Sequence, residues 1–176
     1  LFNVEQIDGL ELPALPELPK PSGSEMAVYL RGRAEALKIG LKHQGDSAFY
    51  NRVTDCVTLP STAFVSDAAY SSELAHELIH ATGSANRLNR KKGEKFGDAA
   101  YALEELVAEL GSAFMCAEFG ISNHYGLQHE SYLASWLKVL GNDNKSFFKS
   151  STAADKAFKL LSGKVSDDFQ SEIETS

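Results

Sequence analysis

Hydrophobic and polar residues follow two different periodicities along the chain. Ser22 and Glu25 form an S-x-x-E pattern that is typical of a helix start, and the following residues predict a helix to about Ile39. Between Ser47 and Leu59 the chain is rich in β-branched and aromatic residues, which predicts a pair of strands. The N-terminal half therefore predicts a helix followed by a small sheet.

Helical spacing of apolar residues returns after the predicted strands. Ser66 or Asp67 can cap a helix that stops at Gly83. The fold class that we expect is therefore α+β, mostly helical, with a small antiparallel or mixed sheet. Three further helices are predicted, at about Asp98–Glu118, at about Glu130–Leu140, and from Asn142 or Asp143 to Gly163.

The two ends of the chain differ from this central domain, which we place at residues 22–163. Four of the five prolines lie between Pro13 and Pro21, so residues 1–21 are expected to form an extended, Pro-rich strap along the surface. Residues 164–176 are acidic and contain few apolar side chains, so this tail is expected to be disordered.

Composition narrows the class of protein. A chain of 176 residues with 43% hydrophobic residues suits one globular domain. The net charge of −7 disfavours general nucleic-acid binding, and we expect the basic loop between Asn86 and Gly97 to be solvated. No apolar run is long enough to span a membrane. Two cysteines without a recognisable signal peptide favour the cytoplasm.

The strongest chemical signal is the sequence His76-Glu77-Leu78-Ile79-His80, which matches H-E-x-x-H on a predicted helix. Residues four apart lie on one face of a helix, so both imidazoles can bind one metal ion. Glu77 lies beside that ion, where it can act as the general base. This pattern predicts a zinc site with a catalytic glutamate.

A catalytic zinc site needs a third protein ligand, and the helix from about Asp98 offers three acids. Glu105 and Glu109 lie opposite its apolar stripe, on a face of small residues that suits close packing of another helix. We therefore predict Glu105 as the third ligand and Glu109 as a hydrogen-bond partner of a ligand histidine. Glu104 lies between the two faces and is not excluded. The metal is then expected between two helices.

Weaker signals concern the substrate. Tyr132 and His129 are possible donors to an oxyanion, and Arg87 is a further candidate.

The combined motifs resemble the zincin-like metallopeptidase domain of ArdC-type antirestriction proteins, a family carried by mobile elements. The similar segments are H-E-L-I-H-A-T-G, R-L-N-R, Y-A-L-E-E-L-V-A-E-L-G-S-A-F and S-Y-L-A-S-W-L-K-V-L-G-N-D. The segment from Glu105 to Glu109 also resembles the E-x-x-x-D/E segment of thermolysin-like peptidases. That resemblance implies that Glu105 is the third metal ligand and that Glu109 is a hydrogen-bond partner of a ligand histidine. Full-length family members carry an N-terminal domain that binds single-stranded DNA, so we expect that partner only through such a domain. Zincin-like folds use the edge of the strand before the H-E-x-x-H helix to pair with an extended peptide. The resemblance therefore implies that the segment Asp55–Leu59 offers an edge to a peptide.

These observations favour a zinc-dependent metallopeptidase domain that hydrolyses peptide bonds in a peptide or protein substrate. The cofactor is expected to be one Zn²⁺ ion, and other divalent transition metals suit the same ligands. The alternative is a metal-stabilised, non-proteolytic binding module that acts in DNA protection or host-protein engagement. A purely structural helical module is a third interpretation. Glu77 favours the enzyme, because metal binding alone needs no general base.

Overall fold

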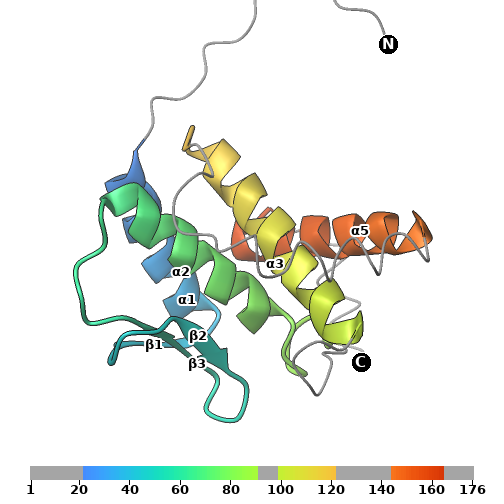
Figure 1. Ribbon diagram of the computed structural model, residues 1–176, viewed down its shortest axis with the longest axis horizontal. Coiled ribbons are helices and arrows are strands. Elements are labelled where there is room, and N and C mark those ends of the chain that lie inside the picture. The colour runs from blue at the N-terminus through green and yellow to red at the C-terminus, as the bar shows by residue number, and fades with distance from the viewer. Residues whose placement is uncertain (1–21, 91–98, 122–143, 165–176) are drawn as a thin grey trace, which may run out of the picture.

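The computed structural model describes residues 22–90, 99–121 and 144–164 (Figure 1). These residues form a mostly helical α+β fold with a small mixed sheet, as the sequence predicts. In chain order the elements are α1 (Gly23–Ala36), β1 (Gly40–His43), β2 (Phe49–Asn51), β3 (Cys56–Leu59), α2 (Asp67–Thr82), α3 (Ala99–Glu118) and α5 (Asn144–Leu161).

Helix α2 lies at the centre of the fold (Figure 1). It packs against α1, α3 and α5, and against strands β2 and β3. Its Leu74, Leu78 and Ile79 side chains are completely buried. The helix begins at the predicted cap, because the Ser66 hydroxyl accepts a hydrogen bond from the backbone N–H of Ala69. A helix that is covered on most sides holds its polar side chains in fixed positions.

Helix α3 packs against α2 and α5 on different faces. A methyl group at Gly111 would lie only 2.9 Å from Cδ1 of Ile79, so this glycine permits the close approach of α3 to α2. On the face toward α5, the rings of Phe114 and Phe158 meet edge to face, with their centroids 6.0 Å apart. Cys116, on the predicted small-residue face, lies 3.3 Å from the Ser72 hydroxyl of α2, so this face and the apolar stripe of α3 are both used in packing.

The sheet has the strand order β1-β3-β2. Strand β2 runs antiparallel to β3, which confirms the predicted strand pair, and β1 runs parallel to β3. Both edges of β3 are therefore occupied, so the prediction that the segment Asp55–Leu59 offers an edge to a peptide is wrong. Only β1 and β2 have an edge that no described strand covers.

The first helix ends earlier than the sequence predicted, and strand β1 follows it. Helix α1 stops at Ala36, and Lys38 adopts a left-handed conformation with φ of 56°. The backbone N–H of Ile39 bonds back to the carbonyl of Ala34, which closes the helix before the strand. The first helix is therefore three residues shorter than predicted.

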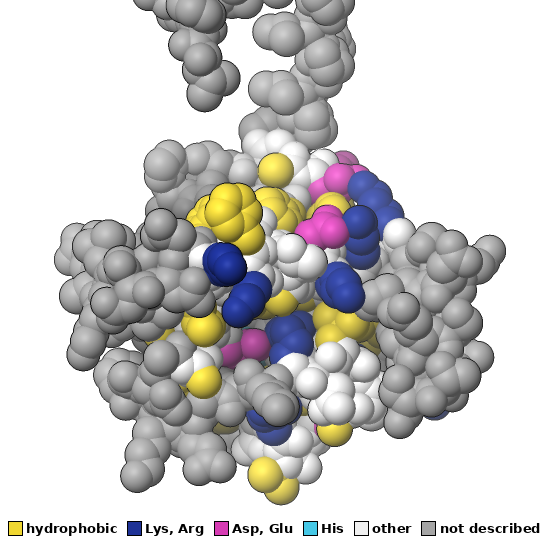
Figure 2. All heavy atoms as spheres, turned by 90° about the vertical axis from the view of Figure 1, so that its right-hand side faces the viewer, with side chains coloured by type: hydrophobic (Ala, Val, Ile, Leu, Met, Phe, Trp, Pro, Cys, Tyr) yellow, Lys and Arg dark blue, Asp and Glu magenta, His cyan; other side chains and the backbone are white. Residues whose placement is uncertain are grey.

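Several predictions fall outside the described residues: the strap at 1–21, the helix at about Glu130–Leu140, and nearly all of the tail at 164–176. Among the described helices, none is long and apolar enough to cross a membrane. Figure 2 shows Lys and Arg side chains gathered on the face at the right of Figure 1. Four of the lysines in the sequence, Lys145, Lys149, Lys156 and Lys159, belong to α5.

Candidate metal centre

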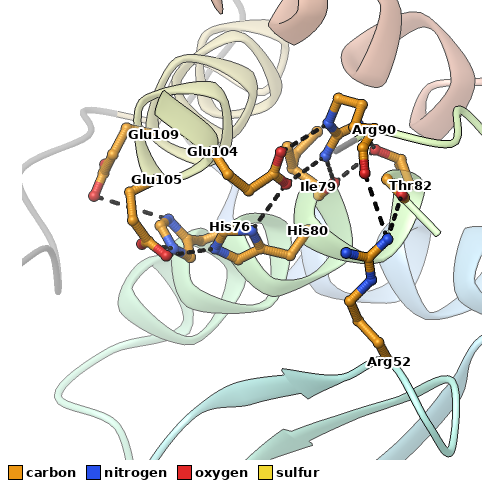
Figure 3. Close-up of polar contacts among 10 residues, drawn as sticks. Arg52, His76, Ile79, His80, Thr82, Arg90, Glu104, Glu105 and Glu109 are labelled. Carbon is orange, nitrogen blue, oxygen red and sulfur yellow. Dashed lines mark hydrogen bonds and ion pairs between the residues drawn. The ribbon is translucent and has the colours of Figure 1, made fainter. Parts of the chain in front are cut away.

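Helix α2 places His76 and His80 one turn apart, and both side chains point toward α3 (Figure 3). Their rings lie nearly perpendicular to each other, with centroids 4.8 Å apart. Both residues are buried, at 8% and 7% exposure. Because α2 is fixed by packing on several sides, the two imidazoles are held before any ligand arrives.

Glu105 of α3 lies opposite both histidines (Figure 3). Its Oε2 is 3.6 Å from Nε2 of His76, and its Oε1 is 3.5 Å from Nε2 of His80. Ligand atoms of the three residues all lie within 4.8 Å of one another. The structure thus brings together the two histidines and the glutamate that the helical-face argument selected.

The spacing of these three residues fits a metal ion. Bonds of about 2.1 Å in tetrahedral geometry separate neighbouring ligand atoms by about 3.4 Å. The two N···O distances of 3.5 and 3.6 Å are close to that value and longer than ordinary hydrogen bonds. A donor set of two imidazoles and one carboxylate is also chemically suited to zinc and related divalent metals.

The other nitrogen of each histidine faces a different glutamate of α3. Nδ1 of His80 is 3.2 Å from Oε1 of Glu104, which is a hydrogen bond between buried groups. Nδ1 of His76 is 3.9 Å from Oε1 of Glu109, which is within ion-pair range but too long for a hydrogen bond. Glu109 therefore faces His76 without the hydrogen bond that the sequence predicted, whereas Glu104 contacts His80 from the side away from Glu105.

Glu104 is held in turn by Arg90, a residue that the sequence analysis assigned to a solvated loop. Arg90 donates from Nε to Oε2 of Glu104 at 3.0 Å and from Nη2 to Oε1 at 2.8 Å. It also donates to the Ile79 carbonyl and to Oγ1 of Thr82, both at 2.8 Å. The loop prediction is wrong here, because the Arg90 side chain is only 11% exposed.

The buried charges shift several pKa values. Burial lowers the pKa of His80, but the carboxylates of Glu104 and Glu105 outweigh it and raise that pKa to about 9. Burial opposes ionisation of Glu104 as well, yet His80 and Arg90 lower its pKa to about 2. The pKa of Glu105 is also held far below its usual range, because both histidines outweigh the effect of burial. Burial raises the pKa of Glu109 to about 7.

Glu77 lies on α2 between the two histidines and is 6% exposed. Its negative charge is close enough to contribute to the raised pKa values of His80 and of Glu73, which lies one turn earlier on α2. A buried carboxylate beside three candidate metal ligands can exchange a proton with a molecule bound there.

The remaining candidates do not reach this centre in the described residues. Arg87 is buried, but it donates to the carbonyls of Ala81 and Leu37 and pairs with Asp55, so it ties the loop to the sheet side of the fold. The prediction of Arg87 as an oxyanion donor is therefore wrong. Tyr132 and His129 lie outside the described residues and stay predictions.

Two solved structures are similar to this chain in fold. The antirestriction protein ArdC of plasmid R388 is similar in its Mn(II)-bound crystal structure, with a TM-score of 0.72 and 32% identity. That match covers 94% of this chain and 61% of the ArdC chain. The metal-free ArdC structure gives a TM-score of 0.68 at 34% identity, over 91% of this chain and 57% of the other.

Sequence comparisons find the same domain in proteins of different lengths. Uncharacterized protein y4eC of Sinorhizobium fredii is 36% identical over 98% of this chain, which spans 56% of that protein. Two DNA primases TraC of Escherichia coli are 40% and 38% identical over 89% of this chain, which spans only 11% and 14% of them. The sequence profile of the zincin-like metallopeptidase family matches residues 32–154. The chain therefore belongs to the zincin-like metallopeptidase family.

Proposed function

We propose that this chain is a metallopeptidase domain in which His76, His80 and Glu105 hold one divalent metal ion. The proposal is supported by the convergence of both Nε2 atoms on the two oxygens of Glu105, at distances that suit a metal. The ion that we propose is Zn²⁺, and the Mn(II)-bound ArdC structure supports a divalent metal at this kind of site.

The chain's own residues supply the other parts of hydrolysis. A divalent metal, when bound, supplies a Lewis acid and lowers the pKa of water at the site to about 7. The carboxylate of Glu77 accepts a proton from the attacking water and later donates it to the nitrogen of the leaving amine. Glu104 and Glu109 face the Nδ1 atoms of the histidines, so that each ring can keep Nε2 free for the ligand position.

The presence of Glu77 is the observation that favours an enzyme over a binding module. A site that only binds metal needs ligands, whereas this centre also places a buried carboxylate between them. The likeness to the antirestriction protein ArdC supports a role for the whole protein in antirestriction. Because the same domain spans 11% to 61% of its relatives, we propose that it works as a module within longer proteins.

The test compares Glu77→Gln with the wild type and with Glu73→Gln as a matched control. Both variants exchange one carboxylate of α2 for an amide, one turn apart. Each protein is loaded with Zn²⁺ and, separately, with Mn²⁺, and is then incubated with a peptide library read by mass spectrometry. We expect Glu77→Gln to lose about 10²–10⁴-fold in cleavage rate, while its metal content and melting temperature stay unchanged.

Retained activity in Glu73→Gln would show that the loss is specific to position 77. The non-proteolytic alternative makes a different prediction: the wild type binds metal fully, cleaves nothing in the library, and Glu77→Gln still protects DNA when placed in the full-length protein. That result would refute the peptidase proposal but would still support the proposed metal site.

A further inference from the structure

Arg90 makes more contacts around the candidate metal centre than its place in a loop would suggest. Its guanidinium donates four hydrogen bonds, two of them to Glu104, one to the Ile79 carbonyl and one to Oγ1 of Thr82. Ile79 and Thr82 belong to α2, and Glu104 belongs to α3. One side chain therefore joins the two helices that carry the metal-binding residues (Figure 3).

The sequence around Gly83 is suited to this arrangement. A methyl group at Gly83 would lie 2.8 Å from Nη2 of Arg90 and 2.9 Å from its Cζ, so glycine at this position leaves room for the guanidinium where it now lies. The loop is fixed by its backbone as well, because the N–H of Arg90 bonds to the Gly83 carbonyl and the N–H of Leu88 bonds to the Thr82 carbonyl. Arg90 is thus positioned by the loop itself.

We propose that Arg90 is a positioning residue for the metal centre, acting through Glu104 on His80. This inference rests on the proposed metal site. The guanidinium of Arg90 donates a hydrogen bond to each oxygen of Glu104, and one of those oxygens faces Nδ1 of His80. A fixed acceptor at Nδ1 orients the ring and directs Nε2 toward Glu105. Removing Arg90 leaves a buried carboxylate without its cationic partner, free to turn away from His80.

The test measures affinity for Zn²⁺ by competition with a chelator, so it needs no catalytic activity. Arg90→Met keeps an apolar side chain but removes the guanidinium group. We expect this variant to bind Zn²⁺ about 10–100-fold more weakly than the wild type. Arg87→Met is the matched control, because Arg87 is a buried arginine of the same loop that contacts none of the three ligand residues. Arg87→Met should lower the melting temperature and keep the wild-type affinity for Zn²⁺.

A double-mutant cycle separates positioning from a general loss of structure. If Arg90 acts through Glu104, then Arg90→Met should add less than threefold to the loss already caused by Glu104→Gln. If Arg90→Met does not fold, Arg90→Gln is measured in its place with the same cycle. The proposal is wrong if Arg90→Met weakens Zn²⁺ binding no more than Arg87→Met does, or if its full effect persists beside Glu104→Gln.

Hydrogen exchange gives a second measurement. Coupling between two sites is reciprocal, so a loop that improves metal binding must itself be stabilised by the metal. Zn²⁺ should therefore slow exchange at the amides of Leu88 and Arg90 in the wild type, and slow it much less in Glu104→Gln. Equal protection in both proteins would contradict the proposed route. Failure of the wild type to bind Zn²⁺ would instead refute the metal site itself.

Discussion

The adjacent glutamates Glu104 and Glu105 should differ sharply when each is replaced by alanine. Glu105 faces the Nε2 atoms of both histidines, whereas Glu104 faces Nδ1 of His80 only. Glu105→Ala therefore removes a proposed metal ligand, and Glu104→Ala removes a group that we propose orients one. The two variants make the same chemical change at neighbouring positions of α3, so each serves as the control for the other.

The size of the difference follows from typical metal-site energies. Structural zinc sites with four ligands bind with about 10–16 kcal/mol at pH 7, which is roughly 2.5–4 kcal/mol per ligand. Glu105→Ala should therefore weaken Zn²⁺ binding by about two to three powers of ten. Loss of an orienting partner costs about 10–100-fold, so Glu104→Ala should keep measurable Zn²⁺ binding.

Fold stability should change in the opposite order. Glu104→Ala leaves Arg90 as a buried charge without its carboxylate partner, which costs roughly 3–5 kcal/mol of unfolding free energy in the metal-free protein. Glu105→Ala removes negative charge from a site that is rich in acids, so its cost should be smaller. Chelator competition and urea unfolding of the metal-free proteins measure the two quantities. Greater loss of Zn²⁺ affinity in Glu104→Ala than in Glu105→Ala would show that Glu104 is the ligand.

Three further predictions concern protons, packing and nucleic acid. Because the pKa of His80 is raised to about 9, we expect Zn²⁺ affinity to rise with pH up to about 9, and calorimetry in different buffers should detect proton release at neutral pH. By the same shift, the contribution of His80 to the stability of the metal-free protein is complete below its ordinary pKa of 6.5 and is lost as the pH rises through about 9. Gly111→Ala should lower the unfolding free energy by about 1–3 kcal/mol, measured by urea unfolding, because the new methyl group overlaps Ile79. With a net charge of −7, this chain should show no submicromolar binding to single-stranded DNA at about 0.15 M salt in a fluorescence-anisotropy titration.

The sequence is informative about the site where local helix geometry decides the arrangement. The spacing of His76 and His80 places both rings on one face of α2, whatever the rest of the fold does. The same rule puts Glu105 and Glu109 on one face of α3, and its small residues indicated that another helix packs there. The structure brings these faces together, so the main part of the candidate site follows from two helical periodicities.

The features that the sequence does not predict depend on contacts between distant segments. Strand β1 has the sequence G-L-K-H, which has little strand character, and it forms because β3 offers a parallel edge 16 residues further along the chain. Arg87 and Arg90 look like parts of a solvated basic loop, yet each is buried against helix-end carbonyls and one acid. No local pattern distinguishes a buried arginine from an exposed one when its partner lies on another element.

The charge balance of the centre connects these observations to the metal. Four glutamates of α2 and α3 are buried around the two histidines: Glu77, Glu104, Glu105 and Glu109. The Arg90 side chain, which is 11% exposed, pairs with Glu104, and an excess of buried negative charge is costly unless it is neutralised. Without a metal, protons reduce that excess, since the pKa of His80 rises to about 9 and that of Glu109 to about 7. A dication bound between the histidines and Glu105 lowers the same excess, and it must displace the proton of His80 to bind. Because Arg90 pairs with Glu104, a bound ion competes with protons to neutralise the other three carboxylates.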